Sequence, residues 1–186
     1  MTEPSDHGAP VPSSVLGRST VDADRFKGAF RHHAAGVAVI SAEVDGPVAL
    51  TASSVTSVSA DPAVLLFSVS STTATGRSLA RASSAVVHLL DADDHPLAVR
   101  CADPSVDRFA DPQAWERLAT GEPAFLGPRV LLRGEVCERI AFGEATVLVL
   151  AVTDVLDRRP QEASRGAALA YVDRRWHSLG PDSTIG

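Results

Sequence analysis

The chain has 186 residues, of which 45% are hydrophobic and 22% charged, and these proportions are typical of one soluble globular domain rather than of a disordered chain. The net charge of −6 argues against a protein that binds nucleic acid, because such proteins concentrate Lys and Arg. No apolar run is long enough to cross a membrane and the first residues lack the order of a signal peptide, so we expect a cytoplasmic protein with no membrane contact.

Composition divides the chain into three parts. Residues 1–21 are rich in Pro, Ser and Gly, which predicts a flexible N-terminal tail. A folded domain is expected over residues 22–180, and residues 181–186 are expected to form a short C-terminal tail.

The first predicted elements are a helix and a hairpin. Residues 22–36 predict a short amphipathic helix with Phe26 and Phe30 on its apolar face. Residues 36–53 alternate in hydrophobicity around Asp45-Gly46, a pair typical of tight turns, and therefore predict two antiparallel strands.

A strand and a small helix are expected next. Residues 61–70 contain the apolar run Val64–Phe67, which predicts a strand buried on both faces. Residues 73–83 predict a small helix that Thr73 or Thr75 can cap.

The second half of the chain is dominated by strands. A strand is expected within residues 84–94, a helix over 93–103, and a loop with one or two helical turns over 103–128. Two long strands follow over 129–159, and a last hairpin over 168–180. Six or seven strands with only short helices between them favour a mainly β fold, a closed antiparallel barrel.

Common catalytic motifs are absent. The chain has no phosphate-binding GxxxxGK[ST], no GxGxxG between strand and helix, no GxSxG and no HExxH, which argues against the corresponding classes of enzyme. Cys101 and Cys137 stand far apart, so neither a zinc site nor a disulfide framework is indicated. Four residues could form a metal site, but aspartate at a helix start is usually a cap, so no metal is expected. The four are His88, Asp91, Asp94 and His95.

Small hydroxyl side chains are concentrated over residues 51–78. Ser71, Thr72 and Thr73 precede a predicted helix, where backbone N–H groups and hydroxyls can hold a phosphate, and Arg77 lies one turn further on. The stretch TASSV, residues 51–55, could lie against a heteroaromatic ring. An equally weighted alternative is that these are ordinary turn and strand-edge hydroxyls.

The same stretch resembles the flavin reductase-like family with the FMN-binding split-barrel fold. ALTASSVTSVSADPAVLLFSVSSTTAT matches the family pattern T-A-[SN]-[SA]-[FV]-x-S-V-S, followed by an Asp-Pro turn, an apolar strand and a Ser/Thr-rich turn. Three further segments fit in the same order, so the resemblance covers residues 22–180. They are FKGAFRHHAAGVAVISA, DRFAD and ALAYVDRRWHSLG.

The resemblance implies an NAD(P)H-dependent flavin reductase, an oxidoreductase that transfers hydride to FMN or FAD. NADH or NADPH would be the co-substrate. Such proteins are usually homodimers and often supply reduced flavin to a partner monooxygenase in a two-component system. The reaction needs little acid-base help from the protein, which must mainly align the two rings and exclude water.

The resemblance also implies a set of site residues, carried over by position. The flavin ring and ribityl chain would be lined by Thr51, Ala52, Ser53, Ser54, Val55, Ser57 and Val58. The phosphate end would be held by Ser71, Thr72, Thr73 and Ala74, with Arg77 and Ser78 nearby. Phe109, Tyr171 and His177 would lie on the open side of the ring. His177 is the candidate catalytic residue, and its alternative is an ordinary surface histidine.

The chain departs from the family pattern in the strand of residues 84–94, where His88 replaces a common Asn. Two other functions stay open at this point. One is a flavoprotein that keeps FMN bound for electron transfer or a biosynthetic redox step, and the other is a split barrel without catalysis that binds other proteins.

Overall fold

The computed structural model describes residues 21–158 and 166–185. They fall into two compact units, and the boundary along the chain lies between His33 and Ala34. The predicted tail lies outside the described residues except for Val21, and the extent of the domain over 22–180 remains a prediction. Within these residues no helix is long and apolar enough to cross a membrane.

The unit that ends at His33 contains the predicted helix, α2 (Ala23–Phe30). Asp22 caps it, because its carboxylate accepts a hydrogen bond from the Arg25 N–H at 3.1 Å. The rings of Phe26 and Phe30, one turn apart, lie 5.0 Å from each other and are exposed. The predicted helix is confirmed over Ala23–Phe30, and residues 31–36 are not helical.

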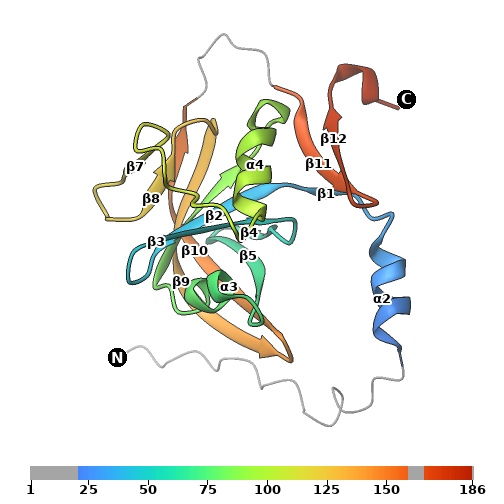
Figure 1. The fold of residues 1–186 in the computed structure, drawn as a ribbon, viewed down its shortest axis with the longest axis horizontal. Helices are drawn as coiled ribbons and strands as arrows, with labels where there is room; N and C mark the ends of the chain where they lie inside the picture. Colours follow the sequence, from blue (N-terminus) through green and yellow to red (C-terminus); the bar gives the residue numbers. More distant parts are fainter. Residues whose placement is uncertain (1–20, 159–165, 186) are drawn as a thin grey trace. The chain divides into compact units, whose positions relative to one another are not determined.

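The second unit is built around a seven-stranded antiparallel sheet in the order β3-β2-β6-β9-β10-β5-β4 (Figure 1). Its strands are β2 (Ala38–Glu43), β3 (Pro47–Ala52), β4 (Thr56–Ala60), β5 (Ala63–Ser70), β6 (Ser84–Leu89), β9 (Val130–Phe142) and β10 (Ala145–Asp157). The predicted hairpin of β2 and β3 is confirmed, with Asp45 and Gly46 at positive φ in the turn. The two predicted long strands are β9 and β10.

Two smaller sheets and short helices complete this unit. One sheet has the order β1-β11-β12, and the other pairs β7 with β8. Their strands are β1 (Ala35–Gly36), β7 (Trp115–Arg117), β8 (Pro123–Phe125), β11 (Ala168–Val172) and β12 (Arg175–Leu179). The helices are α3 (Ala74–Leu79), η1 (Ala92–Asp94), α4 (His95–Ala102) and η2 (Pro181–Ser183). In Figure 1 α4 is drawn between the β7–β8 and β11–β12 pairs.

The large sheet must curl on itself because its two edge strands are consecutive in the chain. Ala52 ends β3 and Thr56 begins β4, so the connection spans at most about 14 Å. No ladder pairs β3 with β4 among the described residues. The fold is therefore mainly β, with a curled antiparallel sheet whose two edges approach each other.

Side chains alternate between two apolar clusters on the two faces of the sheet. Ile40 of β2 and Phe67 of β5 belong to the cluster enclosed by the sheet. Val39 of β2 and Ala49 of β3 point to the other cluster, where Leu97 of α4 packs on them. The short helix α4 thus covers the outer face of β2 and β3.

Two sequence-based predictions about local structure are wrong. Along β5 only Leu65, Phe67 and Val69 are buried, whereas the side chains between them are half-buried, because one face alone meets the core. Residues 103–128 contain the β7–β8 hairpin instead of helical turns. A turn with Gly121 at φ 99° joins its two strands.

His88 is a fully buried polar residue on β6. Its Nδ1 lies 3.0 Å from the carbonyl oxygen of Val39, and the N–H of Phe125 donates to its Nε2 at 3.0 Å. These two bonds match a neutral ring that donates through Nδ1 and accepts through Nε2. Burial lowers the pKa of His88 from 6.5 to about 4. The histidine therefore joins β2, β6 and β8 and is not free to bind a metal through either nitrogen.

His88→Asn should make the free energy of unfolding depend less on pH. Because the folded pKa lies below the unfolded value, the wild-type protein should lose roughly 3 kcal/mol of unfolding free energy as the pH falls from 6.5 to about 4. Urea unfolding at several pH values measures this, with His32→Asn, an exposed histidine, as the control that should keep the wild-type slope. An unchanged slope in His88→Asn would contradict the assignment.

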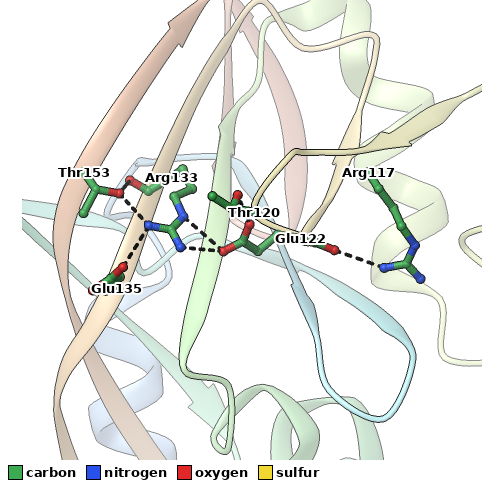
Figure 2. A network of polar contacts seen from close by, with 7 residues as sticks. Arg117, Thr120, Glu122, Arg133, Glu135 and Thr153 are labelled. Atoms are coloured by element: carbon green, nitrogen blue, oxygen red, sulfur yellow. Dashed lines mark hydrogen bonds and ion pairs between the residues drawn. The ribbon is translucent and has the colours of Figure 1, made fainter.

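Glu122 is the buried carboxylate of a polar network that Figure 2 shows. Its Oε1 accepts bonds from Nε and Nη2 of Arg133 at 3.0 and 2.9 Å, and Thr120 donates to Oε2. Arg133 also pairs with Glu135 at 3.1 Å and donates to Thr153 at 2.9 Å. The network ties the strand β9 to the β7–β8 turn.

The charge of Glu122 is held by its hydrogen bonds. Burial acts to raise its pKa, but bonds from Ser84, Thr120, its own backbone N–H and Arg133 outweigh burial and lower the pKa from 4.5 to about 2. The carboxylate thus stays ionised in the folded protein under mildly acidic conditions.

Glu122→Gln should destabilise the fold at neutral pH by roughly 3 kcal/mol, because it leaves Arg133 without its buried counter-charge. The difference from wild type should shrink as the pH falls from 4.5 towards about 2, where the wild-type carboxylate is neutralised in turn. Glu135→Gln, which removes the exposed carboxylate from the same arginine, should cost less than about 1 kcal/mol. If thermal or urea unfolding shows the same loss of stability in Glu122→Gln and Glu135→Gln, then Glu122 is not the buried counter-charge that Arg133 requires.

Candidate functional site

The first group of predicted site residues surrounds the connection between β3 and β4. Ser54 lies in this connection, and its Oγ accepts from the Ser68 N–H at 3.0 Å and donates to the Ser68 carbonyl at 3.2 Å. Ser53 beside it is exposed, and Val55 packs against the enclosed core. Ser54 therefore fastens the connection to β5 and leaves Ser53 to face outwards.

Thr51 and Ala52 precede this connection on β3. The Thr51 hydroxyl donates to the Ala98 carbonyl of α4 at 2.6 Å, and Ala52 is buried in the enclosed core. The hydroxyl of Thr51 thus holds α4 on the sheet. Because this hydroxyl is already bonded, only the backbone of Thr51 is available to contact a ligand.

Ser57 and Val58 follow on the edge strand β4. The pairing of β4 with β5 is irregular between Ser57 and Ser59, and Val58 is the residue that has no partner there. Both Ser57 and Val58 are exposed, Val58 to 56%. This edge is an exposed surface directly beside the connection.

The second group is the hydroxyl-rich turn between β5 and α3. The Ser71 N–H donates to the Glu144 carbonyl at 2.8 Å, and Thr72 Oγ1 lies 2.7 Å from Ser70 Oγ. Thr73 caps α3, because its hydroxyl accepts from the Gly76 N–H at 3.0 Å, which confirms one of the two predicted caps.

Arg77 binds this turn from within α3. Its Nη1 donates to the carbonyls of Ser71 and Thr72 at 3.0 and 3.1 Å. The turn is also tight at Gly76, where a Cβ would lie 1.9 Å from the Ser70 carbonyl oxygen. Arg77 therefore holds the two carbonyl groups of the turn. Ser78, the next residue of α3, is half-buried.

The start of α3 offers free donors. The first turn of a helix has N–H groups without an intrahelical acceptor, and Thr73 satisfies only that of Gly76. Among the described residues the N–H groups of Ala74 and Thr75 remain, and beside them is the exposed hydroxyl of Thr72, which already shares a hydrogen bond with Ser70 Oγ. This is a donor set for an anion.

The two groups meet at one end of β5. Ser54 is bonded to Ser68, and Ser70, which contacts Thr72, lies two residues further along the same strand, roughly 7 Å away. The apolar strand thus places the two hydroxyl-bearing segments side by side.

Phe109 approaches α3 from the segment after α4. Its ring stacks on Phe125 at 5.2 Å and an angle of 15°, and it lines a cavity of about 110 Å³ together with Ala49, Thr75 and Arg108. Phe109 is thereby brought close to the start of α3.

Arg108 is a residue that sequence reasoning did not select. It donates to the carbonyls of Cys101 and Asp103 at 3.2 and 3.0 Å, and its Nη1 lies 3.5 Å from Thr75 Oγ1. It therefore links the end of α4 to the first turn of α3. Arg108 lies in the segment DRFAD, but nothing in that segment shows which carbonyl groups its guanidinium binds.

Tyr171 and His177 lie in the sheet of β1, β11 and β12. Tyr171 contacts Trp176 edge to face at 4.8 Å, and His177 is exposed and pairs with Ala170 across the sheet. No hydrogen bond or ring contact between described residues joins either side chain to the two hydroxyl-bearing segments. Tyr171 packs against the same apolar cluster as Phe109, and no contact of this kind is found for His177 among the described residues.

Comparison with known proteins identifies the family. A family model described as a flavin reductase like domain matches residues 30–180. The NADH:FMN oxidoreductase of Rhodococcus erythropolis is 35% identical over 157 residues, which cover 84% of this chain and 81% of that protein. The reductase component of the 4-nitrophenol 4-monooxygenase/4-nitrocatechol 2-monooxygenase of Rhodococcus opacus is 31% identical, with 92% and 88% covered.

Solved structures agree with the sequence matches. The crystal structure of a flavin reductase domain protein from Arthrobacter sp. FB24 superposes with a TM-score of 0.77 at 30% identity, covering 85% of this chain and 96% of that one. The chain belongs to the flavin reductase like family.

Proposed function

We propose that this protein is an NADH-dependent flavin reductase that reduces FMN and supplies the reduced flavin to a partner monooxygenase. The observation that carries the proposal is the pair of hydroxyl-bearing segments held at one end of β5, in a chain of this family. The names of the relatives from the two Rhodococcus species support the choice of NADH and FMN and the monooxygenase partner.

The chemistry of the turn before α3 fits the phosphate of FMN. The N–H groups of Ala74 and Thr75 and the hydroxyl of Thr72 are donors at the positive end of a helix. Arg77 donates hydrogen bonds to the Ser71 and Thr72 carbonyls, so these two oxygens repel an approaching anion less. FAD would place its first phosphate against the same donors.

The connection between β3 and β4 fits the isoalloxazine ring. The backbone of Thr51 and Ala52 and the exposed Ser53 can face the ring edge, while Val55 offers an apolar wall. A bound flavin supplies two-electron redox chemistry by accepting a hydride from the reduced nicotinamide. The residues of this chain bind and orient the two rings and exclude water, and no general acid or base is required of them.

A homodimer completes the site in this proposal. Tyr171 and His177 lie in a separate sheet, so a second copy of the chain is the simplest source of an aromatic and an imidazole group over the open face of the ring. His177 would orient the nicotinamide rather than transfer a proton.

The closed split barrel and the cytoplasmic location belong to the same proposal. Closure is supported by the short connection between β3 and β4 and by the core that the curled sheet encloses. A cytoplasmic location agrees with a reaction that consumes NADH.

A steady-state assay tests the proposal. The purified protein should oxidise NADH only when FMN is added in excess, and a parallel assay with NADPH, FAD and riboflavin should give lower kcat/KM values. NADH oxidation without added flavin in a yellow protein would instead indicate a flavoprotein with fixed FMN. Failure to oxidise NADH or NADPH at any flavin concentration would overturn the proposal.

Thr72→Ala should weaken FMN binding about fivefold, since one hydrogen bond to the phosphate contributes roughly 1 kcal/mol. Riboflavin, which lacks the phosphate, should bind as to wild type. Thr72 is preferred to Thr73 for this test because Thr73 also caps α3, and its loss would affect stability. Fluorescence titration of flavin gives the dissociation constants, and Thr184→Ala, which removes an exposed hydroxyl near the C-terminus, is the control. Equal effects on FMN and riboflavin would argue against the phosphate assignment.

A further inference from the structure

A second and larger cavity lies beside α4, and none of the residues assigned to flavin lines it. It has a volume of about 520 Å³, which is within the range of small-molecule sites. One wall is a single face of η1 and α4, with Asp93, Pro96, Leu97 and Arg100 at helical spacing. The opposite wall comes from residues just before the β7–β8 hairpin, from the end of β8 and from the residues after it. We call this space the α4 cavity.

Arg100 is a half-buried residue on these walls with an unsatisfied donor. Its Nε is buried and has no hydrogen-bond partner among the described residues, and its guanidinium carbon lies 5.8 Å from the centre of the Phe125 ring, a cation–π contact that leaves the N–H donors free to bind an anion. In contrast, Arg108, Arg133 and Arg158 each donate to carbonyl or carboxylate oxygens. A buried guanidinium donor without an acceptor is costly, and an incoming anion removes that cost.

The acidic residues of the cavity are engaged elsewhere. Asp93 lies 3.8 Å from Arg129, and Asp94 accepts from the Asp91 N–H at 3.0 Å. The Cα atoms of Asp94 and Arg100 are six residues apart along the helix axis, roughly 9 Å. The cavity thus has a cationic end at Arg100 and an acidic end at the start of the helix.

Apart from Gln113, the remaining walls are apolar. Leu97, Phe125 and Leu126 line the cavity between its two ends, and Leu126 is 43% exposed, as expected for a side chain at an open mouth. Arg100 can pair with one negative charge of a ligand, and Arg129 offsets part of the charge of Asp93. A phosphate or diphosphate would meet greater repulsion from Asp93 and Asp94.

From these observations we propose that the α4 cavity binds an organic monocarboxylate, with its carboxylate on Arg100 and its apolar body against Leu97, Phe125 and Leu126. Arginine with a carboxylate is a strong, charge-assisted pair, and the apolar walls select against inorganic anions. None of the residues assigned to flavin lines this cavity. The site is therefore distinct from the proposed flavin site.

Binding of 3-phenylpropanoate to the full-length protein tests this assignment by titration calorimetry. The acid should bind at least tenfold more tightly than 3-phenylpropan-1-ol, which has the same body without the charge. Arg100→Met keeps the length of the side chain and should remove that preference, while Arg81→Met, an exposed arginine paired with Asp45, should keep it. Circular dichroism spectra that match wild type ensure that each variant is folded.

Three outcomes would overturn the assignment. The first is equal affinity of the acid and the alcohol for the wild-type protein, and the second is equal affinity of the acid for wild type and Arg100→Met. The third is loss of acid binding when FMN or NADH saturates the protein, because the cavity would then belong to the flavin or nicotinamide site.

If Arg100→Met does not fold, Arg100→Gln replaces it, because it keeps a polar side chain and removes the charge. An unchanged preference for the acid in Arg100→Gln would overturn the proposal.

Discussion

The connection of residues 53–55 is the constraint on which the rest of the second unit depends. It joins β3 and β4, which lie at opposite edges of a seven-stranded sheet, and so forces the sheet to curl round its apolar core. Ser54 fixes this connection by bonding both backbone groups of Ser68 on β5. The same residues therefore set the curvature of the fold and the position of the proposed ring site.

In the turn before α3 a charged side chain binds the backbone of the turn. Sequence reasoning assigned Arg77 to the phosphate as a charged partner. In the structure its guanidinium donates to the carbonyls of Ser71 and Thr72, which are the groups that would repel an anion. Arg139 acts at the other end of α3 by donating to the Ala80 and Ala82 carbonyls. Both ends of this short helix are thus held by arginine, and its N-terminal donors are left for a ligand.

Much of the fold could be predicted because its signals are local. The Asp45-Gly46 turn and the alternation of residues 36–53 defined a hairpin, and the Ser/Thr run before Gly76 defined a capped helix. The β7–β8 hairpin was missed because its strands are three residues each, and they are stabilised by contacts distant in sequence, such as the bond from the Phe125 N–H to His88. Short strands of this kind carry too little periodicity to be recognised.

Of the candidate site, the proximity of the two hydroxyl-bearing segments could be predicted because both adjoin β5, whereas their contact with flavin stays a prediction. Arg108 could not, since its role depends on α4 and α3 coming together. The titratable groups with the clearest physical function, His88 and Glu122, are parts of the fold rather than of the site. Hydride transfer between two bound rings requires that the rings are aligned and that water is excluded. It needs no ionisable side chain, so such residues can contribute to the stability of the fold instead. This division explains why the search for a catalytic acid or base along the chain found no candidate beyond His177.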